Sequence, residues 1–216
     1  MLNRLFAAAP DLVTAAVFLV AWMAPAIPGP EYVNDLVLAM FMAAFVIFAG
    51  VVYTMLVKAG GSRIQNAFVL LMMAAVLMLI LINFLNENTH PGQRQELDFT
   101  ITQPVRLLPF LWMYASQFLH LLFARPRDPG AEARRMETLS TLSVAAYVGS
   151  FLAAAALPLA PHGITPEFVA SLHRGDDMWG VHVYIPIAFG AFYFGLQALI
   201  KFALGAPAPR VARVPG

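Results

Sequence analysis

The chain has 216 residues, of which 60% are hydrophobic and 12% are charged, and its formal net charge is +1. Soluble domains are about 45–50% apolar and about 25% charged. So few charges cannot cover a water-facing surface, and the near-zero net charge excludes the basic footprint of a nucleic-acid-binding protein. The chain has no cysteine, which excludes disulfides, thiolate metal sites and a thiol nucleophile. The composition therefore predicts a polytopic membrane protein.

Six apolar runs are long enough to cross the bilayer, which takes about 20 mostly apolar residues as a helix. They cover residues 12–27, 33–57, 67–84, 105–124, 142–160 and 181–204. The runs are too long and too uniformly apolar for β-barrel spans, which alternate over about ten residues. The sequence predicts an all-α fold in which residues 1–216 form a single membrane domain, a six-transmembrane-helix bundle, with 205–216 as a flexible tail.

The first run also resembles a signal peptide, because Ala24-Pro25-Ala26 mimics a cleavage site. A single basic residue, Arg4, and an acidic one, Asp11, precede that run and argue against this interpretation. We therefore expect the run to be retained as the first span. With Asp11 placed before the span, no predicted span carries an acidic residue near its centre, which argues against ion-coupled transport.

Lysine and arginine are distributed unequally between the two sets of predicted loops. One set, which includes both termini, holds ten of these residues, and the other holds three. Cytoplasmic loops are enriched in lysine and arginine. We therefore expect both termini in the cytoplasm, and a composition rich in Ala, Arg, Pro and Val favours a multi-pass protein of a bacterial inner membrane. The three tryptophans, Trp22, Trp112 and Trp179, are predicted to form an outer aromatic belt.

Three local patterns suggest further structure. A short surface helix is expected within the cytoplasmic loop 125–141, and another within residues 166–173 of an outer loop. In the fifth span, small residues are spaced by four along two ridges, which allows close approach of neighbouring helices. The ridges are Ala145, Gly149 and Ala153, and Ala146, Ser150 and Ala154.

Polar side chains in the second, fourth and sixth spans lie one to two turns above the basic cytoplasmic ends. If these faces converge, they form a ligand-binding pocket with one titratable group. The candidate ligand-binding residues are His120, Gln117, Ser116, Tyr193, Gln197, Tyr53 and Thr54. The competing interpretation is an ordinary interfacial belt in which glutamine hydrogen-bonds across helices. No catalytic residue is predicted, because no carboxylate is available to orient a Ser116–His120 pair.

Four of the five histidines lie on the predicted outer face, near carboxylates. Imidazole and carboxylate ligands suit Zn²⁺ or Cu²⁺. The candidate metal ligands are His90, His162, His173, His182, Glu87 and Asp176. No tight ligand motif is present, so the competing interpretation is a set of solvated loop residues, and the sequence by itself requires no cofactor.

These observations leave three hypotheses open. The first is a non-catalytic subunit or assembly factor of a larger membrane complex, with a membrane-protein partner or a second copy of the chain. The second is a permease or binding module for a small neutral or lipophilic compound. The third is a metal-dependent activity on the outer, periplasmic face. In all three hypotheses the protein contacts the lipid bilayer. Topology alone cannot distinguish the three functions.

Overall fold

The computed structural model describes residues 2–60, 62–89, 111–112, 129–156, 162–172 and 182–204. Regular structure in these residues is entirely helical, which confirms the all-α class. The helices are α1 (Leu2–Met23), α2 (Pro30–Lys58), α3 (Arg63–Thr89), α5 (Pro129–Ala156), α6 (Pro166–Ala170) and α8 (Tyr184–Leu204). The predicted fourth span, apart from residues 111–112, and the predicted tail lie outside the described residues.

Three helices are long and apolar enough to cross a membrane. Their qualifying segments are Arg4–Met23 in α1, Ala133–Ala156 in α5 and Tyr184–Leu204 in α8. In α2 and α3 the apolar stretches found within the described part of the chain are shorter, Ile47–Leu56 and Ile64–Ile80. These helices make the chain a membrane-embedded protein.

The first helix is displaced toward the N-terminus relative to the predicted span 12–27. It begins at Leu2 and passes through Pro10, and it ends at Met23. Proline cannot donate a backbone hydrogen bond and disfavours a helix interior, and Pro25 and Pro28 lie in the turn that follows α1. Asp11 therefore lies inside a membrane-spanning helix, and the expectation that the spans lack a central acidic residue was wrong.

The turn before α2 and the turn between α2 and α3 depend on glycine residues and on side-chain capping. Gly29 (φ +85°) and Gly60 (φ +74°) adopt left-handed conformations before α2 and after it. At the start of α3, Ser62 and Gln65 cap each other. The Gln65 backbone N–H donates to Ser62 Oγ at 3.3 Å, and the Ser62 N–H donates to Gln65 Oε1 at 2.9 Å. This reciprocal capping box fixes the tight reversal between α2 and α3.

The predicted surface helix in 125–141 and the predicted span 142–160 form one continuous helix, α5, from Pro129 to Ala156. Proline at the first helical position costs no hydrogen bond, and no proline follows it within α5. Of the two small-residue ridges, Ala146, Ser150 and Ala154 are buried, whereas Ala145 and Gly149 are exposed. One ridge, not both, therefore provides the close contact.

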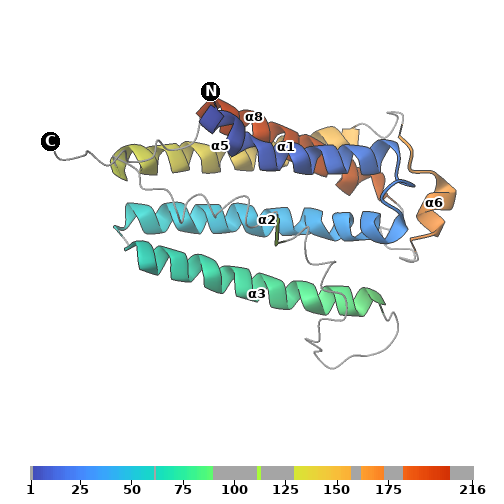
Figure 1. Ribbon diagram of the computed structural model, residues 1–216, viewed down its shortest axis with the longest axis horizontal. Coiled ribbons are helices and arrows are strands. Elements are labelled where there is room, and N and C mark those ends of the chain that lie inside the picture. The colour runs from blue at the N-terminus through green and yellow to red at the C-terminus, as the bar shows by residue number, and fades with distance from the viewer. Residues whose placement is uncertain are drawn as a thin grey trace.

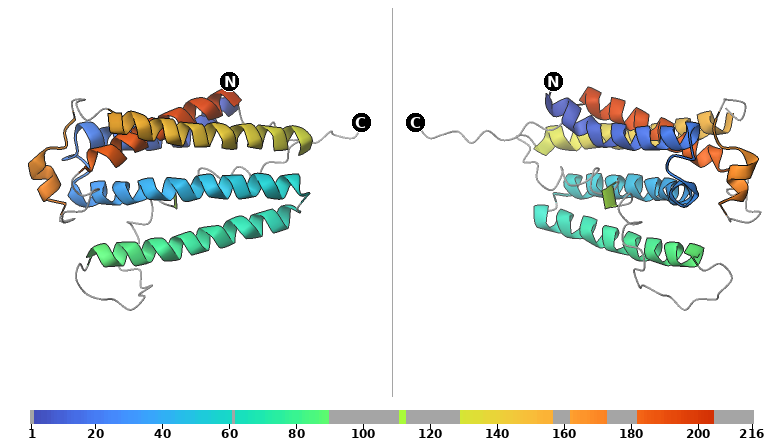
Figure 2. Two further views of the ribbon diagram at one scale, coloured as in Figure 1. Left: turned by 180° about the vertical axis from the view of Figure 1, so that it is seen from behind. Right: turned by 45° about the vertical axis from the view of Figure 1, so that its right-hand side comes forward.

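The helices form a bundle with an uneven distribution of contacts. Helices α1, α5 and α8 pack together on one side, α2 lies against α5 and α8, and α3 packs chiefly against α2 (Figures 1 and 2). The main core lies among α1, α2, α5 and α8 and includes Phe18, Val37, Ile187 and Phe189. Among the described helices, α3 is consequently the outermost of the bundle.

The short helix α6 lies at the end of the bundle opposite the turn between α2 and α3 (Figure 1). Thr165 caps it, because its Oγ1 accepts a 3.3 Å hydrogen bond from the Phe168 N–H. The backbone N–H of Glu167 and the Thr165 side chain lower the pKa of Glu167. The preceding loop is attached to α1, since the Gly163 N–H donates to the Trp22 carbonyl at 2.9 Å.

Candidate functional site

The first and last described helices pack antiparallel and in close contact. The rings of Phe18 and Phe194 stack with centroids 5.7 Å apart. A methyl group on Gly190 would overlap the Phe18 ring, so glycine is what permits this approach. One turn away, Trp22 is 9% exposed and meets Phe192 edge-on at 5.6 Å. Trp22 is therefore a core residue, not the aromatic belt residue that we predicted.

An ion pair lies along the same contact. Lys201 Nζ in α8 is 2.7 Å from Asp11 Oδ2 in α1, and their side chains are 4% and 0% exposed. A charge in the bilayer is costly unless it is paired, so each residue requires the other. The pair fixes the register of α1 on α8.

A second polar contact joins α5 to α8. Ser143 Oγ donates to Gln197 Oε1 at 3.1 Å, and Gln197 is 1% exposed. Tyr193, one turn from Gln197, is 3% exposed and lies edge-on to Tyr147 at 5.8 Å. The glutamine thus hydrogen-bonds across helices, as the competing interpretation of the predicted pocket requires.

Two further members of the predicted ligand-binding set, Thr54 and Tyr53, make other contacts. Thr54 is buried, and its hydroxyl donates to the Gly50 carbonyl one turn earlier at 2.9 Å. Tyr53 packs against a separate small cluster that contains Ala49 and Leu70. The other three residues lie outside the described part of the chain, namely Ser116, Gln117 and His120. Among the members that the structure describes, Tyr193 and Gln197 lie together.

Two of the predicted metal ligands lie beside one tyrosine. His162 stacks on Tyr184 with ring centroids 5.2 Å apart, and His182 meets the same ring edge-on at 5.9 Å. In the residues that the structure describes, no group of three metal-ligating side chains is present. The other candidates fall outside this test, namely His90, His173 and Asp176 by position, and Glu87 because its side chain is not described. The metal site stays a prediction.

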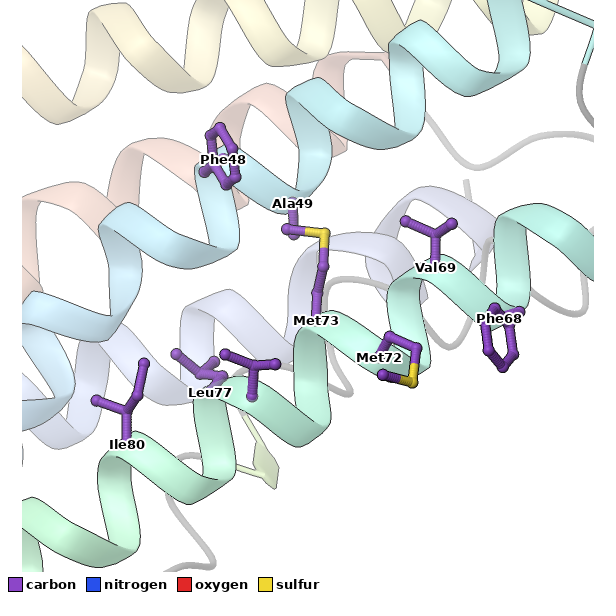
Figure 3. Close-up of a pocket in the computed structure, with 9 residues that line it drawn as sticks. Phe48, Ala49, Phe68, Val69, Met72, Met73, Leu77 and Ile80 are labelled. Atoms are coloured by element: carbon purple, nitrogen blue, oxygen red, sulfur yellow. The ribbon is translucent and has the colours of Figure 1, made fainter.

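A groove that we did not predict separates α2 from α3. Its volume is about 350 Å³, within the roughly 300–1,000 Å³ typical of small-molecule sites. All its lining residues are apolar, namely Phe48, Ala49, Phe68, Val69, Met72, Met73, Val76, Leu77 and Ile80. Met73 extends from α3 toward Ala49, and Val69 and Ile80 point from α3 toward α2 (Figure 3). We call this feature the α2/α3 groove.

The charge pair had a detectable signal in the sequence, and the groove had none. Asp11 and Lys201 each have apolar residues on both sides, which marks them as candidates for helix interiors. Because the predicted first span begins at Leu12, Asp11 was placed outside the helix. The groove depends on how far α3 lies from α2, and an apolar helix carries no sequence signal for that distance.

No family model, curated protein or solved structure matches this chain.

Proposed function

We propose that this chain is a membrane-embedded binding module for a small lipophilic compound, which it holds in the α2/α3 groove. The observation that carries the proposal is the apolar groove of about 350 Å³. A polar ligand would gain little there, since the described residues that line the groove offer no polar side chain to bind it. Lipophilic compounds dissolved in the bilayer match this apolar lining.

The groove is accessible from outside the protein. Three of its lining side chains, Phe68, Met72 and Val76, are 62%, 50% and 52% exposed. They form an open rim on α3, so a ligand can enter sideways without unfolding either helix. Met72 and Met73 add unbranched, adaptable side chains, which suit an irregular apolar ligand.

The test compares two matched variants. Val76→Trp places a large ring in the groove, and Leu71→Trp adds the same ring on the part of α3 outside it, where Leu71 is 61% exposed. We expect lipophilic compounds that co-purify with the protein to decrease in Val76→Trp and to remain in Leu71→Trp. The measurement is organic extraction of each purified protein followed by mass spectrometry. Equal content in both variants would contradict the proposal.

A second candidate function is that of a subunit of a larger membrane complex, and the position of α3 favours it. One face of α3 exposes six large apolar side chains, and the opposite face packs on α2. The exposed residues are Ile64, Phe68, Leu71, Met72, Val76 and Leu79. Exposed apolar helix faces of this size suit either acyl chains or a partner helix.

Substitution by a charged residue distinguishes an α3 face covered by a partner helix from one covered by acyl chains. If a partner covers α3, Leu71→Arg dissociates a complex of fixed stoichiometry, whereas Leu12→Arg on the exposed face of α1 leaves it intact. The measurement is native mass spectrometry of protein purified in mild detergent. Recovery of the unsubstituted protein as a lone monomer would count against this candidate.

We further propose that the chain crosses a bacterial inner membrane six times, with both termini on the cytoplasmic side. The excess of lysine and arginine on one side supports this topology. The turn between α2 and α3 and the helix α6, which belong to opposite sides in it, lie at opposite ends of the bundle (Figure 1).

A further inference from the structure

We infer that Arg4 of α1 and Arg135 of α5 form a site for the phosphate group of an anionic bilayer phospholipid. The site lies at the end of the bundle where α1 and α5 begin and α8 ends. It is independent of the α2/α3 groove, because neither arginine lines that groove. The inference follows from the register of the three helices, from the charge at this end and from the apolar surface beside it.

The register of α1 on α8 places Arg4 beyond the last residue of α8. Two contacts fix this antiparallel register, Asp11 with Lys201 and Phe18 with Phe194. Arg4 precedes Asp11 by seven residues, so at 1.5 Å per residue it is level with a point about 6 Å beyond Leu204. Arg4 belongs to the stripe of α1 that faces α8, and it is exposed because α8 ends before this level. The buried members of the stripe are Ala8, Asp11, Ala15 and Phe18.

Arg135 lies at nearly the same level on α5. The register of α5 on α8 is fixed by the contacts of Ser143 with Gln197 and of Tyr147 with Tyr193. Arg135 precedes Ser143 by eight residues and is therefore level with a point about 1.5 Å beyond Leu204, so the two arginines differ in height by only about 4.5 Å. Lys201, in the last turn of α8, interacts electrostatically with Arg135, as this register requires. Figures 1 and 2 show the start of α1 beside the end of α8, with α5 starting at the same end of the bundle.

The charge at this end of the three helices favours an anion. Four basic residues against two acidic ones give a net charge of +2, whatever ion pairs they form among themselves. The basic residues are Arg4, Arg134, Arg135 and Lys201, and the acidic residues are Asp11 and Glu132. A guanidinium group has five N–H donors in a planar fork, which matches two oxygens of one phosphate group. Basic residues at the membrane surface attract anionic lipid headgroups in the same way.

The surface beside Arg4 indicates that the phosphate belongs to a lipid. Immediately after Arg4, the outward face of α1 exposes large apolar side chains along most of the helix. They are Leu5, Phe6, Leu12, Val13, Leu19 and Val20. Acyl chains of a bilayer lie along such a face, and the headgroup of the same lipid then lies level with the first turn of α1. A free phosphate would contact the arginines and leave this apolar face without a ligand.

The experiment uses the full chain in mild detergent with equal amounts of palmitoyl-oleoyl phosphatidylglycerol and palmitoyl-oleoyl phosphatidylcholine. The two lipids have the same acyl chains, so native mass spectrometry of the bound lipids reports the headgroup preference alone. We expect phosphatidylglycerol to predominate, and its ratio to phosphatidylcholine to fall about fivefold in Arg4→Gln and in Arg135→Gln. The matched control is Arg134→Gln, because Arg134 is exposed on the outward face of α5. It removes the same charge and should leave the ratio within about twofold of its original value.

Three other results would overturn the inference. Equal binding of the two lipids by the unsubstituted protein would show that the arginines only stabilise the C-terminal end of α8, where the helix dipole favours cations. An equal fall in Arg134→Gln and Arg135→Gln would show diffuse attraction without a site. Displacement of phosphatidylglycerol by sodium phosphate, but not by sodium chloride of equal ionic strength, would assign the site to free phosphate. Arg4 is exposed, so Arg4→Gln decides between these results even if Arg135→Gln does not fold.

Discussion

At the scale of single residues, the Asp11–Lys201 pair is the contact on which most depends. Both side chains are buried, with Nζ and Oδ2 2.7 Å apart. Removing one member of a buried pair leaves an uncompensated charge and typically costs about 3–5 kcal/mol. We expect Asp11→Asn to lower the free energy of unfolding by this amount, measured by denaturant titration of the protein in detergent micelles.

The chain contains its own control for this prediction. Lys58 Nζ and Glu137 Oε1 are 2.8 Å apart and form a second ion pair, but their side chains are 48% and 56% exposed. Exposed pairs contribute about 0–1 kcal/mol, so Glu137→Gln should change stability little. Adding Lys201→Met to Asp11→Asn should recover most of the loss, because no unpaired charge then remains at this contact. Equal effects of Asp11→Asn and Glu137→Gln would refute this account of the pair.

Gly190 gives a second prediction at the residue scale. A methyl group at this position would overlap the Phe18 ring, which is fully buried and has no room to move. Overpacking of this kind costs about 1–3 kcal/mol, so Gly190→Ala should lower the unfolding temperature. Gly195 lies in the same helix and has nothing within 4 Å of the new methyl group. There the substitution should raise stability by about 0.5–1 kcal/mol, and a thermal shift of the same sign in both variants would contradict the packing argument.

At the scale of helices, the side chains of Gln197 in α8 and Ser150 in α5 differ in their hydrogen bonding. Gln197 Oε1 accepts a hydrogen bond from Ser143, whereas Gln197 Nε2 and Ser150 Oγ are buried and have no hydrogen-bond partner in the described residues. Hydrogen bonds between membrane helices average about 0.6 kcal/mol and reach about 1.7. Gln197→Leu should therefore destabilise the bundle by at most this amount, because it also removes the buried Nε2 that has no partner in the described residues.

Ser150→Ala should have no destabilising effect, because it removes a hydroxyl that gains no bond from its burial. Double-mutant cycles with Ser143→Ala, read out by denaturant titration, measure the coupling of Ser143 to each position. Coupling to Ser150 as strong as coupling to Gln197 would show that the helices are joined differently.

At the scale of the whole molecule, the proposed topology can be tested without background, because the chain has no cysteine. Ser62→Cys places a thiol before α3, and Ser171→Cys places one just after α6, at the other end of the bundle (Figure 1). If the termini are cytoplasmic, a membrane-impermeant thiol reagent should label Ser171→Cys in cells with a permeabilised outer membrane. It should label Ser62→Cys after the inner membrane is disrupted. Labelling of both thiols from one side would exclude this topology.

The sequence by itself determined the helical class and several helix ends. Composition and long apolar runs dictate membrane helices, since a backbone in hydrocarbon must satisfy its own hydrogen bonds. The predicted last residue of the sixth span, Leu204, is the last residue of α8, and a short helix begins at Pro166 as expected. Local chemistry is sufficient for these features, because proline, glycine and capping residues act within one turn.

Tertiary structure decided which polar residues meet. Asp11 and Lys201 are 190 positions apart in the sequence, so their pairing follows from the antiparallel packing of α1 on α8. Tyr193 and Gln197 are buried, and within the described residues they contact Tyr147 and Ser143 of α5. The α2/α3 groove likewise exists because α3 packs loosely on α2, a property of two surfaces together. An apolar membrane helix does not encode its neighbours locally, since lipid and protein interiors are equally apolar to its side chains.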